Sequence, residues 1–197
     1  MIAIIDYDAG NIKSVEKALQ KLGADVLVTK DAKEILQADK VILPGVGAFG
    51  VAMANLKKFG LDKVIYEVVE KGTPFLGICL GLQLLFERSD ETPGVAGLGI
   101  LKGEILRIPD KEDLKIPHMG WNGIEELKTG LFDGVEEGAF VYYVHSFHAL
   151  MCDEAIAVSH HGVDFCGALC KGNFYGTQFH PEKSGATGAR ILHNFLI

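Results

Sequence analysis

Residues 74–83, PFLGICLGLQ, place Cys79 between a short apolar run and a segment of helix-forming residues. The run before the cysteine has the composition of a buried strand, and the residues after it favour a helix. Gly77 and Gly81 stand two residues either side of Cys79, where a sharp turn between strand and helix has room only for small residues. The stretch therefore has the pattern of a nucleophile elbow with cysteine in place of serine.

The same order of strand and helix runs through the first half of the chain. Apolar strands are expected at residues 2–5, 26–29, 41–43 and 74–78, and helices at 12–22, 31–38, 61–71 and 80–88. This alternation predicts a parallel, doubly wound sheet. Between residue 99 and about residue 178, short β-prone stretches separated by Gly, Asp and Pro indicate hairpins, and a last helix is expected at 185–196. We therefore expect an α/β protein with a largely parallel open sheet flanked by helices and antiparallel strands in the C-terminal half.

Length and composition limit the classes of protein to which the chain can belong. The 197 residues are 48% hydrophobic and 23% charged, which is typical of a globular protein and predicts a single domain over 1–197. The formal net charge of −7 argues against a nucleic-acid partner. No apolar run approaches the ~18 residues of a membrane span. The four cysteines follow no secretion signal and lack metal-site spacing, so we expect free thiols, a cytoplasmic protein, no metal and no cofactor.

Cys79 is the candidate nucleophile. The N-terminus of a helix favours the thiolate, and the N–H of Leu80 is well placed to hold an oxyanion. The alternative is a buried core cysteine beside two glycines that allow close helix packing, because free cysteine is among the most buried residue types.

His180 is the candidate base. It follows residues 176–179 (GTQF), which are expected to form a strand, and in an extended chain Glu182 points to the same face. A carboxylate beside an imidazole fixes its tautomer and stabilises its charged form. Together with Cys79, these residues form a Cys-His-Glu set suited to covalent acyl transfer. The alternative is an ordinary histidine at a strand end beside a surface glutamate.

The segment GVGAFG at residues 45–50 matches the dinucleotide-binding pattern G-x-G-x-x-G. It follows the third expected strand, whereas that pattern normally follows the first, and Pro44 precedes it directly. A backbone loop that lends N–H groups to an oxyanion is the better interpretation.

Two longer motifs resemble those of the class I (triad) glutamine amidotransferases, PFLGICLGLQ at residues 74–83 and QFHPEKS at residues 178–184. Within that class, four further stretches resemble the family of glutaminase subunits of imidazole glycerol phosphate synthase: residues 6–11, 44–49, 117–122 and 144–147. The resemblance covers essentially the whole chain. It departs from the family pattern at Asp8-Ala9 and at His148.

This resemblance implies specific roles for the candidate residues. Cys79 attacks the carboxamide of glutamine, His180 passes a proton to the leaving ammonia, and Glu182 orients His180. The backbone of Val46 and of Leu80 holds the oxyanion. A glutamyl thioester forms, and water releases glutamate from it.

The resemblance also implies a substrate site and a partner. Gln83 and Ser146 are expected to bind the α-amino and carboxylate groups of glutamine. Ammonia is expected to pass to a cyclase subunit with a (β/α)₈ barrel, which must be a separate chain because no cyclase sequence is fused here. Candidate contacts with that partner are Asn11, Met119, Trp121 and Lys183. Interfaces are enriched in Trp and Met, but core packing is an equal alternative for these two. The rival functions are another class I glutaminase, a catalytically silent scaffold subunit and a dinucleotide-binding protein.

Overall fold

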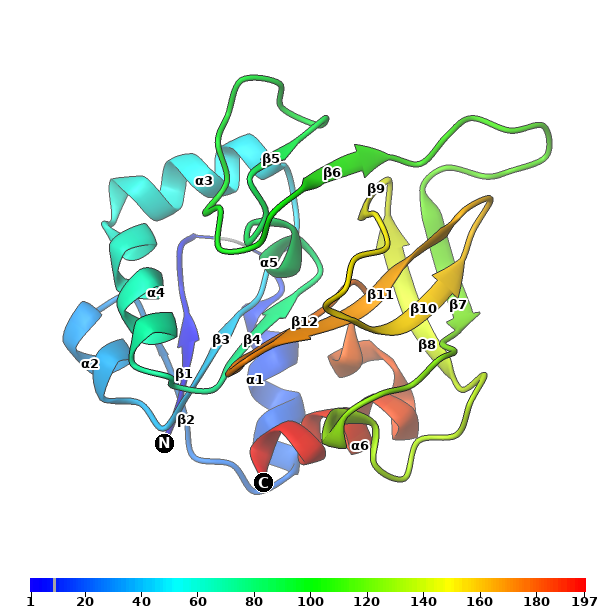
Figure 1. The fold of residues 1–197 in the computed structure, drawn as a ribbon. Coiled ribbons are helices and arrows are strands. Elements are labelled where there is room, and N and C mark those ends of the chain that lie inside the picture. The colour runs from blue at the N-terminus through cyan, green and yellow to red at the C-terminus, as the bar shows by residue number, and fades with distance from the viewer. Residues whose placement is uncertain (9) are drawn as a thin grey trace.

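The computed structural model describes residues 1–8 and 10–197, so Ala9, at one of the two departures from the family pattern, lies outside the described residues. A seven-stranded sheet forms the centre of the molecule (Figure 1). Its strands, in chain order, are β1 (Ile2–Ile5), β2 (Val26–Thr29), β3 (Lys40–Leu43), β4 (Phe75–Ile78), β10 (Ala155–His160), β11 (Asp164–Lys171) and β12 (Phe174–Thr177). Across the sheet they lie in the order β10-β11-β12-β4-β3-β1-β2.

The direction of the strands changes late in the chain. The five strands from β12 to β2 are parallel, whereas β11 and β10 are antiparallel to their neighbours. The mostly parallel sheet with antiparallel strands in the C-terminal half confirms the fold class that the sequence predicts. The adjacency of β12 and β4 matters most for function, because it brings the C-terminal motif beside the elbow.

Helices cover both faces of the sheet. On one face, Ala3 and Ile5 of β1 pack in the same core cluster as α2 (Ala32–Gln37), α3 (Phe49–Lys58) and α4 (Leu61–Glu70). On the other face, Ile2 and Ile4 pack with α1 (Ile12–Lys21) and α6 (Gly185–Leu196). Successive residues of a strand point to opposite faces, so a continuous apolar strand such as β1 is buried on both. Figure 1 shows α1 and α6 close together beside the sheet.

Two smaller sheets complete the structure. Strands β5 (Arg88–Ser89), β6 (Glu104–Arg107) and β9 (Phe147–Ala149) form one, and β7 (His118–Gly123) pairs with β8 (Phe140–His145) to form the other. Short 3₁₀ turns are η1 (Gly130–Phe132) and η2 (Pro181–Lys183). None of the helices in the described part of the chain is long and apolar enough to cross a membrane.

The helix after Cys79 is shorter than the sequence predicts. We expected it to reach residue 88, but α5 covers only Leu80–Gln83. The carbonyls of Leu84 and Leu85 accept hydrogen bonds from the N–H groups of Leu98 and Leu101, so a loop replaces the next helical turn. The pattern of apolar residues did not reveal this, because an apolar side chain can be buried from a loop as well as from a helix, and both leucines are fully buried in this loop.

Candidate active site

Cys79 lies at the tight turn between β4 and α5, with φ 54° and ψ −107°. This is a sparsely populated backbone conformation for a residue other than glycine, and such strain concentrates at functional sites. The turn is held by a hydrogen bond of 2.7 Å from the Cys79 N–H to the Thr177 carbonyl. A Cβ on Gly81 would lie 1.9 Å from the Leu43 carbonyl oxygen, and one on Gly77 would lie 2.8 Å from the Gly81 carbonyl oxygen. The prediction that only small residues fit on either side of Cys79 is confirmed.

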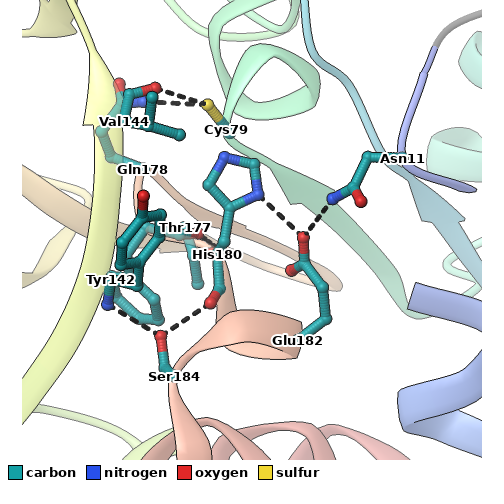
Figure 2. Close-up of polar contacts among 10 residues, drawn as sticks. Asn11, Cys79, Tyr142, Val144, Thr177, Gln178, His180, Glu182 and Ser184 are labelled. Atoms are coloured by element: carbon teal, nitrogen blue, oxygen red, sulfur yellow. Dashed lines mark hydrogen bonds and ion pairs between the residues drawn. The ribbon is translucent and has the colours of Figure 1, made fainter. Parts of the chain in front are cut away.

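His180 reaches the site because β12 runs parallel to β4, with Thr177 opposite Ile78. The chain that leaves β12 therefore passes next to Cys79. The His180 N–H donates to the Tyr142 carbonyl at 2.9 Å, and the Ser184 hydroxyl donates to the His180 carbonyl at 2.6 Å (Figure 2). These bonds fix the backbone on both sides of the imidazole.

Glu182 bonds to the imidazole as the sequence predicts, but by a different route. His180 Nδ1 and Glu182 Oε1 are 2.8 Å apart, and their side chains are 1% and 0% exposed. We expected an extended chain to align them, whereas Glu182 lies in the 3₁₀ turn η2. The same oxygen accepts a second bond of 2.7 Å from Asn11 Nδ2. Figure 2 shows the imidazole between Cys79 and Glu182, with Asn11 on the far side of the carboxylate.

The surroundings of the imidazole favour its charged form. Burial lowers the pKa of His180, but the neighbouring Cys79 and Glu182 outweigh burial and raise that pKa to about 10. Within the described residues, His180 Nε2 has no hydrogen-bond partner. The Cys79 Sγ lies 3.6 Å from Gln178 Nε2 and 4.0 Å from the Val144 carbonyl oxygen. The imidazole lies between this sulfur and the Glu182 carboxylate (Figure 2).

A cavity of about 440 Å³ opens in front of Cys79, within the size range of small-molecule sites. Its lining includes all four residues expected to bind the oxyanion or the substrate, namely Val46, Leu80, Gln83 and Ser146. The Leu80 N–H opens α5 and so has no partner within that helix. Gln83 Nε2 donates to the Phe147 carbonyl at 2.9 Å and to Gln178 Oε1 at 3.1 Å, which fixes the amide at the cavity wall.

Glu91 is a cavity residue that the sequence did not point to. Its Oε2 accepts a hydrogen bond of 2.7 Å from the Phe49 N–H, at the start of α3. A carboxylate therefore occupies the helix N-terminus that a dinucleotide phosphate would need, which argues against the dinucleotide-binding interpretation of GVGAFG. The two residues are 42 positions apart along the chain, so no periodic pattern could have revealed their contact.

Two neutral histidines support the wall of the cavity. Asn122 Nδ2 donates to His118 Nε2 at 3.2 Å, His118 Nδ1 donates to His145 Nε2 at 2.9 Å, and His145 Nδ1 donates to the Phe147 carbonyl at 2.8 Å. The Asn122 amide is oriented by bonds to two backbone groups, so this direction of donation is the consistent one. Burial, with like-charge repulsion from a neighbouring imidazole, lowers the pKa of His118 to about 4. Burial likewise lowers the pKa of His145 to about 3, despite the bond to Phe147.

Of the four candidate partner contacts, one lines the cavity and two lie on β7, which pairs with the cavity-lining strand β8. Met119 and Trp121 on β7 are 63% and 55% exposed, so the alternative that they pack in the core is wrong. Lys183 lines the cavity, with its Nζ 5.9 Å from the centre of the Tyr142 ring, and that ring contacts Trp121 edge to face. Asn11, the fourth candidate, lies beside the triad instead, with its amide on Glu182.

Comparisons with known proteins agree with this geometry. Residues 3–197 match the family model for "Glutamine amidotransferase class-I". The chain is 55% identical to the "Imidazole glycerol phosphate synthase subunit HisH" of Bacillus cereus (strain G9842), with 99% of this chain and 93% of that protein covered. It is 49% identical to the protein of the same name from Geobacter metallireducens, covering 100% and 97%.

Solved structures agree on the fold. A crystal structure of a glutamine amidotransferase superposes with a TM-score of 0.76 at 16% identity and covers 99% of this chain and 96% of that one. At such low identity the superposition supports the fold alone, whereas the relatives above are similar enough to decide the family. The chain therefore belongs to the class I glutamine amidotransferases and, within them, to the family of the imidazole glycerol phosphate synthase subunit HisH.

Proposed function

We propose that the chain is the glutaminase subunit of imidazole glycerol phosphate synthase. In this role it hydrolyses glutamine to glutamate and ammonia and passes the ammonia to a separate cyclase subunit with a (β/α)₈ barrel, in histidine biosynthesis. The observation that carries the proposal is the line from Cys79 through His180 to Glu182 at the head of a cavity, in a chain about half identical to proteins of that name.

The geometry supports a thioester mechanism. The Cys79 thiolate attacks the carboxamide carbon of glutamine, and the His180 imidazolium gives its proton to the leaving ammonia. Water then attacks the thioester while His180 accepts a proton, and glutamate leaves as the thiolate is restored. The buried carboxylate of Glu182 holds the imidazole in one orientation and stabilises its charge in both steps. The N–H groups of Val46 and Leu80 are the proposed donors to the oxyanion.

The cavity also supports a site for the amino-acid end of the substrate. Gln83 and Ser146 are the proposed ligands of the α-amino and α-carboxylate groups. Glu91, an acidic residue of the cavity lining, is suited to the positive charge of the α-ammonium group. A substrate held in this way places its carboxamide toward Cys79.

An exposed apolar strip on β7 and β8 supports docking of a protein partner. Met119 and Trp121 extend from β7, and Phe140 on β8 is 61% exposed. Large apolar side chains gathered on one surface are typical of protein interfaces. Lys183 lines the cavity, its Nζ lies 5.9 Å from the centre of the Tyr142 ring, and that ring contacts Trp121, so the strip is next to the site. We infer that a partner bound to the strip extends over the mouth of the cavity. Such a closed route keeps ammonia from being protonated in water, and only neutral ammonia is a nucleophile.

The proposal is tested by substituting Cys79 and assaying the complex that the chain forms with the cyclase subunit. Cys79→Ala is expected to abolish glutamine-dependent synthesis while ammonium-dependent synthesis continues at the wild-type rate, because the thiolate is needed only to release ammonia. Cys170→Ala, at a half-buried thiol outside the cavity, is the matched control and is expected to keep both activities. Hydrolysis of glutamine by Cys79→Ala at the wild-type rate would exclude Cys79 as the nucleophile.

A further inference from the structure

Asn11 has an unusual position for a residue at the start of a helix. It is the N-cap of α1 and has a left-handed backbone conformation, with φ 69° and ψ 9°. Asparagine at an N-cap normally accepts a hydrogen bond from the first turn of its helix, but the side chain of Asn11 makes no such bond. Its amide instead donates to Glu182 Oε1, 171 residues away along the chain.

The carboxylate that receives this bond has few other partners. The Glu182 side chain is fully buried, and a buried carboxylate is costly unless it is paired and hydrogen-bonded. Among residues 1–8 and 10–197, His180 Nδ1 and Asn11 Nδ2 are its only hydrogen-bond donors, both on Oε1, and Oε2 has none. Of these two donors, the Asn11 amide is the neutral one, and it holds the carboxylate from the side opposite the imidazole (Figure 2).

We propose that Asn11 is a positioning residue of the triad, whose amide fixes Glu182 Oε1 against His180 Nδ1. The proposal rests on the proposed function, because it concerns the same three residues. Asn11 acts on the nucleophile only through Glu182 and His180. The N-terminal segment before α1 thereby becomes part of the catalytic arrangement.

Two substitutions distinguish the effect of the Asn11 side-chain amide from the effect of the left-handed backbone conformation at this residue. Asn11→Gly removes the side chain at a φ that glycine adopts without strain. Asn11→Asp keeps the shape and tolerates the left-handed conformation, but replaces the donor by a carboxyl group. Asp8→Gly is the matched control, since Asp8 also has positive φ (61°) in the same segment, and its exposed side chain pairs with Lys30.

The two variants are expected to respond differently to pH. In Asn11→Asp, two carboxyl groups come into contact, and such a pair cannot easily ionise twice. At low pH the pair shares a proton, so the new carboxyl group still donates a hydrogen bond to Glu182. As pH rises and that proton leaves, the second negative charge repels Glu182. In Asn11→Gly the donor is missing at every pH.

The other charged groups around Glu182 do not differ between the variants. They are His180 with Cys79 behind it, Lys183 on η2, and the exposed Lys17 and Lys21 of α1. A difference between the pH profiles of the two variants therefore reports the group at position 11.

The first experiment measures glutamine-dependent and ammonium-dependent synthesis at saturating cyclase subunit, from about pH 6 to about pH 8.5. Asn11→Gly is expected to lower kcat for glutamine about 10- to 100-fold with little change in KM, because a small misplacement of a catalytic group has effects of this size. Asn11→Asp is expected to approach the wild type at the acidic end and to lose kcat as pH rises. Ammonium-dependent synthesis and the Asp8→Gly variant stay at the wild-type level. A kcat unchanged in Asn11→Gly, or pH profiles that are parallel for the two variants, would overturn the proposal.

The second experiment is independent of glutamine turnover. The full chain is alkylated with iodoacetamide across the same pH range, and modification of the peptide that contains Cys79 is followed by mass spectrometry. Without the Asn11 amide, the Glu182 carboxylate is no longer held against His180 Nδ1 and supports the positive charge of the imidazole less. Because a positive neighbour favours the thiolate, Asn11→Gly is expected to move the acidic limb of Cys79 alkylation upward by about half a pH unit or more. An unmoved limb would contradict the role of Asn11. If the wild-type complex fails to use glutamine, the proposed function fails, while the alkylation profile still decides the role of Asn11.

Discussion

Acidification is expected to destabilise the protein through the neutral histidines behind the cavity wall. His145 is buried, donates to the Phe147 carbonyl and accepts from His118 at 2.9 Å, so a second proton on its ring would displace the bond from His118. Its pKa is lowered to about 3, against about 6.5 in an unfolded chain. A histidine with a depressed pKa contributes its full share of stability above pH 6.5. This contribution to stability is lost as pH falls from 6.5 toward the pKa of the histidine in the folded protein, because the unfolded chain binds the proton first.

The size of this effect follows from the two pKa values. At about pH 5 the unfolded imidazole is almost fully protonated and the folded one is almost fully neutral, so His145 alone lowers the free energy of unfolding by about 2 kcal/mol relative to about pH 7.5. This free-energy change depends little on the pKa of His145 in the folded protein, so long as that pKa stays below about 4. A change of about 2 kcal/mol is a large fraction of the roughly 5–15 kcal/mol that typically stabilises a domain.

The assay is urea unfolding of the wild type and of His145→Asn at about pH 7.5 and about pH 5, followed by fluorescence of Trp121 or by circular dichroism. The variant starts less stable, because its hydrogen bonds at the cavity wall are disturbed, but it is expected to lose about 2 kcal/mol less on acidification. Both proteins keep His180, so the titration of the triad cancels in the comparison. His118→Asn supplies a second measurement, since the pKa of His118 is lowered for the same reason, its burial. Equal acid sensitivity of the wild type and both variants would refute the reasoning.

Two further predictions concern the site itself. Glu182→Gln is expected to reduce glutamine turnover less than His180→Ala. The proposed role of Glu182 is only to orient and stabilise the imidazole, whereas proton transfer of the kind proposed for His180 contributes about 10²–10⁴-fold to the rate. Steady-state kinetics of the two variant complexes give the order of the two losses, and a reversed order would contradict these roles. Gly81→Ala is expected to lower the melting temperature well below that of Gly130→Ala, because a Cβ on Gly81 would lie 1.9 Å from the Leu43 carbonyl oxygen, whereas one on Gly130 would meet only Asp133 Oδ2 at 3.6 Å. Thermal unfolding measures the difference, and similar melting temperatures would count against the elbow geometry.

The parts of the fold that the sequence predicts are those set by local pattern. The apolar strands β1 to β4, the helix that starts after Asn11 and the turn at Cys79 all depend on spacing within a few residues. The order of strands in the sheet is not local, and nothing in residues 174–177 indicates that they pair with residues 75–78. The expected length of α5 was wrong for a related reason, since hydrogen bonds from a distant segment end this helix early.

In the candidate site, too, some residues could be predicted from local sequence, whereas the contacts of others depend on distant segments. Cys79, His180 and Glu182 could be identified because each belongs to a long motif, and the structure brings the three side chains together. The contacts of Asn11 and Glu91 span 171 and 42 residues, and neither leaves a periodic signal. Asn11 even has a sufficient local explanation as a helix cap, which its side chain does not fulfil.

The position of β12 between β4 and β11 has a consequence for the protein as it is made. A chain emerging from the ribosome completes β4 at Ile78, but the strand that covers its free edge begins at Phe174, about a hundred residues later. At a synthesis rate of about 5–20 residues per second, the apolar β4 waits roughly 5–20 s with one row of backbone groups unpaired. The same delay separates the residues of the proposed triad, because Cys79 is made early whereas His180 and Glu182 follow β12. The set of Cys79, His180 and Glu182 is therefore complete only after β12 has been made and the central sheet can close.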